Sequence, residues 1–157
     1  MIGEYFRDPR IEFETLSPVP IITVAAAGHP LADRMRHRPP GGMIELSELA
    51  DHLQIVIEDP TSLSDGRTFD VLSPETWRVS SQEAKRSLIL AGLGWGRLPL
   101  WAVEGDLAGG RLLRLPAPGL GHQGEIGLNA YLAHHTDAWP GPAAQVLRQA
   151  LLRAAGR

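Results

Sequence analysis

The chain has 157 residues, a size that suits one ordinary domain and is too small for two full ones. Hydrophobic residues make up 43% and charged residues 21%, which indicates a globular protein and excludes a disordered one. The formal net charge of -3 argues against a free-standing nucleic-acid-binding domain, because such domains usually carry a basic patch. The absence of cysteine excludes disulfide scaffolds, thiolate metal sites and cysteine nucleophiles.

Membrane and export signals are not apparent in the sequence. No apolar run approaches the roughly 18 residues that a membrane-spanning helix needs. The first residues lack the charged-then-apolar pattern of a secretory signal. Together with the lack of cysteine, this pattern predicts a cytoplasmic location.

Two strands are predicted near the front of the chain, at residues 11–16 and 19–27. The first alternates apolar and charged residues, and the second is almost continuously apolar, as in a strand buried on both faces. Glycine and proline at 28–32 are expected to end the second strand, and residues 33–43 are predicted to form a polar loop. Ser47 is the predicted N-cap of a short helix at 48–51.

The rest of the chain alternates predicted strands and helices, which indicates an α/β fold. Ser80 and Glu83 fit a capping box that begins a helix, and Gly92 supplies its left-handed end. Proline and glycine make residues 116–121 the best candidate for a linker. The other expected elements are strands at 54–58, 77–80 and 111–115, a turn at 94–99 leading to a short strand, a helix at 100–108, a strand at 127–133 and an amphipathic helix after Pro142.

Four segments of the sequence, taken in order, resemble one known family. They are VAAAGHPLA at 24–32, IELSELADH with QIVI at 44–57, AGLGWGRLP at 91–99 and DLAGGRL at 106–112. Each is common by itself, but their order and spacing together are specific. They resemble the effector-binding domain of LysR-type transcriptional regulators, over nearly the whole chain.

The resemblance implies an α/β fold of the type-2 periplasmic-binding-protein-like class, in which two lobes enclose a ligand cleft. Residues 25–119 would form lobe II nearly complete, and residues 1–24 and 120–157 would form a partial lobe I. In the family, a DNA-binding helix-turn-helix and the first elements of lobe I precede the matching region. The sequence is therefore interpreted as an amino-terminally truncated regulator.

The function implied is the sensing of a small, carboxylate-containing effector in the cleft between the lobes. DNA would be contacted only through the absent amino-terminal domain, the chain would form a homo-oligomer, and no membrane partner is expected. No enzymatic activity, catalytic residue, metal site or cofactor is expected either. Two alternatives stay open: an extracytoplasmic solute-binding receptor of the same fold, and a non-functional fragment.

Five residues are candidate effector contacts. Ser80 and Ser81 precede a predicted helix, whose positive end attracts anions, although Ser80 alternatively only caps it and leaves Ser81 as the freer donor. Thr61 follows a strand end, where α/β folds collect ligands, but Asp-Pro before it also fits an ordinary turn. Trp95 lines the cleft or packs in the core, and His29 is a ligand contact at the lobe crossover or a turn residue.

Overall fold

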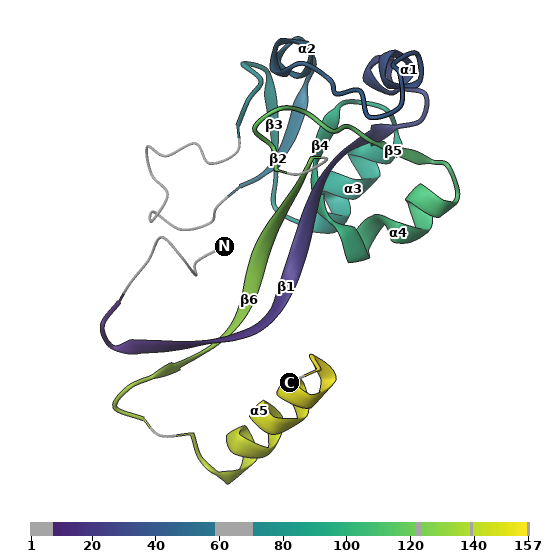
Figure 1. Cartoon of the computed structure of the whole chain (residues 1–157). Coiled ribbons are helices and arrows are strands. Elements are labelled where there is room, and N and C mark those ends of the chain that lie inside the picture. Colours follow the sequence, from purple (N-terminus) through teal and green to yellow (C-terminus); the bar gives the residue numbers. More distant parts are fainter. Residues whose placement is uncertain (1–7, 59–70, 122–123, 139, 157) are drawn as a thin grey trace. The chain divides into compact units, whose positions relative to one another are not determined.

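The computed structural model describes residues 8–58, 71–121, 124–138 and 140–156 (Figure 1). The chain divides into two compact units, with residues 1–19 and 127–157 in unit 1 and residues 20–126 in unit 2. The lobe limits expected from the resemblance fall at 24/25 and 119/120. Residues 20–24 and 120–126 belong to unit 2, and the assignment of the two lobes stays a prediction.

The sheet has the strand order β3-β2-β4-β1-β5, and β6 also pairs with β1. β2 runs parallel to β3 and β4, whereas β1 runs antiparallel to β4 and β5. One antiparallel strand within a set of parallel strands therefore separates β4 from β5. The strands are β1 (Ile11–Ala26), β2 (Gln54–Ile57), β3 (Thr76–Val79), β4 (Trp95–Pro99), β5 (Leu112–Arg114) and β6 (Glu125–His135).

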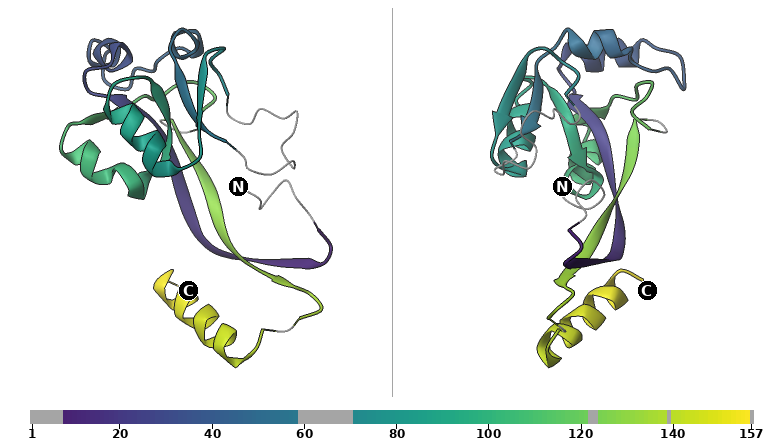
Figure 2. Two further views of the ribbon diagram at one scale, coloured as in Figure 1. Left: turned by 180° about the vertical axis from the view of Figure 1, so that it is seen from behind. Right: turned by 90° about the vertical axis from the view of Figure 1, so that its left-hand side faces the viewer.

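Side chains alternate across the sheet of unit 2 and form a core on each face. On one face Trp95 and Ala25 pack with Leu31 and Leu49, which come from α1 and α2. The other core contains residues of the strands, α3 and α4, namely Ile22, Val24, Ile55, Ile89, Leu98, Val103 and Leu112. In unit 2 the helices lie beside the strands (Figure 2), and they are α1 (Pro30–Arg36), α2 (Leu46–Ala50), α3 (Gln82–Leu90) and α4 (Leu100–Ala108). Helix α5 (Pro142–Ala154) belongs to unit 1.

The front of the chain departs from the prediction in two places. The strands expected at 11–16 and 19–27 form one strand, β1, because Pro18 and Pro20 precede the positions that pair with β4, so their missing N–H groups interrupt no bond there. Residues 33–36 of the loop expected at 33–43 are helical and belong to α1. His29 caps this helix and Pro30 occupies its first turn, where proline needs no hydrogen-bond donor.

Two predicted helix caps are also wrong by one or two residues. Glu45, not Ser47, is the N-cap of α2, and its backbone N–H donates a hydrogen bond to the carboxylate of Glu48. Ser81, not Ser80, is the N-cap of α3. At α3 two adjacent serines both favour an N-cap, and at α2 glutamate is not among the usual N-cap residues. The pattern therefore predicted each helix but not its first residue.

The predicted linker at 116–121 is packed into unit 2. Ala117 is fully buried and Leu120 is 6% exposed, and both belong to the core that contains Trp95. The carbonyl of Pro116 accepts a hydrogen bond from the N–H of Ile44. Apolar residues between the prolines and glycines explain why this segment behaves as core rather than as a flexible connection.

Several predicted elements are confirmed. Helix α4 spans Leu100–Ala108 as expected, and Gly92 has the positive φ of 78° expected after α3. In unit 1, α5 begins with Pro142, and Arg148 on this helix forms two hydrogen bonds with Glu14 on β1. None of the helices in the described segments has the length and apolar character of a membrane span.

Candidate functional site

The candidate site lies at the edge of unit 2 where two parallel strands end together. Ile57, the last residue of β2, is the register partner of Val79, the last residue of β3. One residue further on, the N–H of Glu58 donates to the carbonyl of Val79 at 2.9 Å. The carboxyl ends of parallel strands are where open α/β sheets collect ligands. The structure thus brings Glu58, Ser80 and the start of α3 to one edge.

Ser81 sits at the start of α3 with its hydroxyl at the first turn. Its Oγ accepts a hydrogen bond of 3.1 Å from the N–H of Ala84, and its carbonyl accepts one from Lys85. The hydroxyl hydrogen of Ser81 is not used by this bond and remains able to donate. Ser80, which was expected to be the cap, is exposed beside it. Both serines therefore keep a donor for a ligand.

The backbone of α3 adds further donors. The first N–H groups of any α-helix have no partner within the helix, and the aligned peptide dipoles make that end positive. At α3 these groups belong to Gln82 and Glu83, while the third is bonded to Ser81. The side-chain Oε1 of Gln82 is buried and has no hydrogen-bond partner in the described part of the chain. Gln82 was not among the residues singled out from the sequence.

Charges of both signs surround this edge. Glu58 follows β2, Glu83 lies in the first turn of α3, and the exposed Arg78 stands on β3 opposite Val56. A carboxylate beside a helix N-terminus complements the dipole of its own helix. It also weakens the attraction for a second anion. The edge therefore suits a ligand that combines an anionic group with hydrogen-bond donors.

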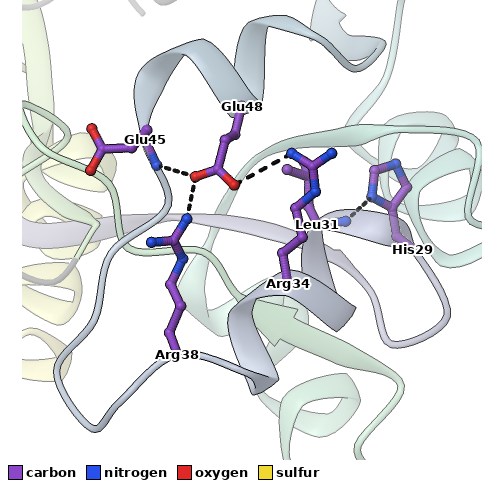
Figure 3. Close-up of polar contacts among 6 residues, drawn as sticks. All are labelled: His29, Leu31, Arg34, Arg38, Glu45 and Glu48. Atoms are coloured by element: carbon purple, nitrogen blue, oxygen red, sulfur yellow. Dashed lines mark hydrogen bonds and ion pairs between the residues drawn. The ribbon is translucent and has the colours of Figure 1, made fainter.

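The other three predicted contacts are placed differently. Thr61 lies outside the described residues. Trp95 is fully buried, and its indole Nε1 donates to the carbonyls of Leu49 at 2.9 Å and His52 at 3.2 Å. His29 is 5% exposed, and its Nδ1 accepts a hydrogen bond from Leu31 (Figure 3). Both side chains are engaged in holding unit 2 together, and the structure does not bring them to the edge formed by Ser80 and Ser81.

Metal binding has no support in the described segments, which contain no group of three or more histidine, cysteine, aspartate or glutamate side chains arranged to hold an ion. The adjacent His134 and His135 lie on β6, where successive side chains point to opposite faces.

Comparison with known proteins relates the chain to one family. The sequence matches the family model of the LysR substrate binding domain over residues 1–156. Among curated proteins, none matches the sequence.

Solved structures of regulatory domains share the fold. The regulatory domain of MetR, a LysR family regulator from N. meningitidis, is similar with a TM-score of 0.69 and 18% identity, over 97% of this chain and 68% of that one. The effector-binding domain of QuiR in complex with shikimate has a TM-score of 0.68 and 22% identity, over 99% and 69%. Full-length LysG from Corynebacterium glutamicum with bound effector Arg has a TM-score of 0.63 and 21% identity, over 97% of this chain and 48% of that one.

These likenesses confirm the predicted fold class, an α/β fold of the periplasmic-binding-protein-like type. The match to the family model extends over all but the last residue of the sequence. The chain belongs to the LysR substrate-binding domain family.

Proposed function

We propose that this chain is the effector-sensing part of a LysR-type transcriptional regulator. A small, carboxylate-containing effector binds at the edge of unit 2 formed by Glu58, Ser80 and Ser81. The observation that carries the proposal is that α3 begins at its N-cap, Ser81, near the point where β2 and β3 end together. Hydroxyl groups and backbone N–H groups at a helix N-terminus suit a carboxylate.

The acidic neighbours narrow the chemistry of the effector. Glu58 and Glu83 disfavour a ligand that offers only negative charge, because like charges repel one another. A carboxylate that also carries hydroxyl or ammonium groups would satisfy both kinds of partner. The related QuiR domain was solved with shikimate and LysG with the effector Arg, which supports a small polar ligand for this family.

Thr61 stays a predicted contact in this proposal, whereas Trp95 and His29 are left out because both are buried and bonded inside unit 2. The effector would act by favouring one of two arrangements of the domain. The shift in the equilibrium between them is set by the difference in its affinity for the two. DNA would be contacted by a segment outside this sequence, and the sensing part would work in a cytoplasmic homo-oligomer. No step of this function requires catalysis.

A thermal-shift screen of the whole chain tests the proposal. We expect small hydroxy- and amino-carboxylates to raise the unfolding temperature, and the corresponding amides to have no effect, because binding to the folded state alone stabilises it. Ser81→Asp keeps a capping oxygen but has no donor, because an ionised carboxylate only accepts hydrogen bonds. With the charge-assisted hydrogen bond lost, the affinity for the carboxylate should fall about tenfold or more.

Ser87→Ala is the matched control, because Ser87 is an exposed serine on the same helix. It should leave the ligand-induced shift unchanged. Equal shifts by carboxylates and amides, or an unchanged shift in Ser81→Asp, would contradict the proposed site.

A further inference from the structure

A buried histidine, His29, and a partly buried one, His52, join the first helix of unit 2 to the second. His29 caps α1: its Nδ1 accepts a hydrogen bond of 3.2 Å from the N–H of Leu31. To accept this bond, Nδ1 must be unprotonated, so the neutral ring carries its hydrogen on Nε2. Only 5% of His29 is exposed, and Leu31 next to it is fully buried.

His52 follows α2 and packs against this cap. The two imidazole rings meet edge to face, with centroids 5.1 Å apart and an angle of 68° between planes. Nε2 of His52 is buried and has no hydrogen-bond partner among the described residues. The carbonyl of His52 accepts a hydrogen bond from the indole of Trp95, which fixes this segment on the sheet.

The ion pairs of α1 and α2 do not involve the imidazoles of His29 and His52. On α1, Oδ1 of Asp33 lies 4.0 Å from Nη1 of Arg36 and 3.9 Å from Nδ1 of His37. On α2, Glu48 pairs with Arg34 and Arg38 (Figure 3).

Three further charged residues lie near the pair in the sequence or on a packed element. The side chains of Glu45 and Asp51, at the two ends of α2, are exposed, as is Glu75, whose carbonyl accepts a bond from Gln54. None of these carboxylates forms an ion pair with His29 within the described part of the chain. A proton on His29 would therefore face His52 and the positive end of α1.

We propose that His29, packed against His52, forms an acid-sensitive latch that holds α1 and α2 on unit 2 while the His29 ring is neutral and releases them when it is protonated. A proton on Nδ1 points a second donor at the N–H of Leu31 and so removes the cap. It also places a positive charge at the helix end that favours negative charge.

The electrostatic balance at His29 agrees with this geometry. Burial, and secondly the neighbouring His52, lower the pKa of His29 below its ordinary value of 6.5. The folded protein therefore resists protonation of this ring, and energy is released when the cap opens and the ring charges in water. Acid should thus open the latch, and neutral conditions should keep it closed.

Hydrogen exchange of the Leu31 amide, measured by NMR on the whole chain from about pH 7.5 to about pH 4.5, tests the latch. After correction for intrinsic exchange rates, protection of Leu31 should fall by about fivefold, the effect of losing an ordinary cap. In His29→Asn, the amide oxygen still caps α1 but does not titrate, so protection should not depend on pH.

His37→Gln is the matched control, because His37 is an exposed histidine at the other end of α1. It should behave like the unchanged chain. Should His29→Asn fail to fold, the ring titration of His29 in His52→Gln gives a second readout, and its midpoint should rise. Constant protection of Leu31 in the unchanged chain, the same pH dependence in His29→Asn, or an unmoved midpoint in His52→Gln would overturn the latch.

Discussion

The carboxylate of Asp106 on α4 lies 2.6 Å from Nη2 of Arg86 on α3, and its side chain has no exposed surface. The other oxygen is 2.5 Å from Nη2 of Arg111, whose backbone N–H also donates to the carbonyl of Asp106. One buried carboxylate thus ties α3, α4 and the approach to β5 together. Because α3 carries Ser81, this clamp fixes the helix whose first turn forms the proposed site.

Replacing Asp106 by asparagine should destabilise unit 2 strongly. The change removes the buried carboxylate from Arg86 and Arg111, whose side chains are 37% and 64% exposed, and losing its charge-assisted hydrogen bond costs about 1.5–3 kcal/mol. Urea unfolding followed by circular dichroism measures the loss. Glu104→Gln, at an exposed acid on the same helix, should change the free energy of unfolding by less than about 0.5 kcal/mol. Similar losses in the two variants would contradict the clamp.

Two glycines allow a matched test of packing between α3 and β4. A Cβ at Gly96 would lie 2.8 Å from Cδ1 of Ile89 and 2.9 Å from the carbonyl oxygen of Ile55, so Gly96→Ala should cost about 1–3 kcal/mol. At Gly105, within α4, a Cβ would meet nothing within 4 Å. Gly105→Ala should therefore stabilise the protein by about 0.5–1 kcal/mol. Denaturation midpoints that move in the same direction in both variants would refute this packing.

Trp95→Phe should affect stability and leave effector binding unchanged. The substitution removes the indole N–H and leaves the carbonyls of Leu49 and His52 without that donor, at a cost of about 1–3 kcal/mol. Paired unfolding and ligand-titration experiments separate the two properties. A large loss of effector affinity without a loss of stability would contradict this prediction and show that Trp95 contacts the effector.

Glu48 should contribute stability that acid removes. The backbone N–H of Glu45, and then Arg38 and Arg34, lower the pKa of Glu48 below its ordinary value of 4.5 (Figure 3). A carboxyl group with a lowered folded pKa stabilises the protein above the unfolded pKa, and this contribution is lost as pH falls through the folded pKa.

Glu48→Gln removes only the charge, since the side-chain oxygen of glutamine can still accept the hydrogen bond from the N–H of Glu45. It should lower the free energy of unfolding by about 0.5 kcal/mol near neutral pH and make no difference in strong acid. Unfolding curves at several pH values measure this. A difference that persists unchanged in acid would show that the charge of Glu48 is not involved.

Local patterns predicted most of the elements of unit 2, because strand runs and helix signals such as Gly92 act over a few residues. The pattern was insufficient where one residue type has two uses. Pro30 ends a strand and equally begins a helix, and α1 was missed for that reason. The segment containing Ala117 and Leu120 resembled a linker because its prolines outweighed the apolar residues that the fold buries.

The candidate site was predictable only in part. Ser81 was singled out from the sequence as the freer donor beside the expected cap Ser80. Its placement at the same edge as Glu58 depends on the pairing of β2 with β3, which no local pattern specifies. Trp95, flanked by two glycines, gave no indication of the carbonyl partners on α2 that hold it in the core. The clamp at Asp106 also joins residues far apart in the sequence.

Titration of the isotope-labelled chain with a hydroxy-carboxylate, followed by amide NMR, tests the central claim most directly. If the effector binds at the start of α3, the largest changes in chemical shift should fall on the amides of Gln82 and Glu83, and the matching amide ligand should leave them unmoved. Saturable changes confined to other parts of unit 2, with Gln82 and Glu83 unaffected, would contradict the proposed site.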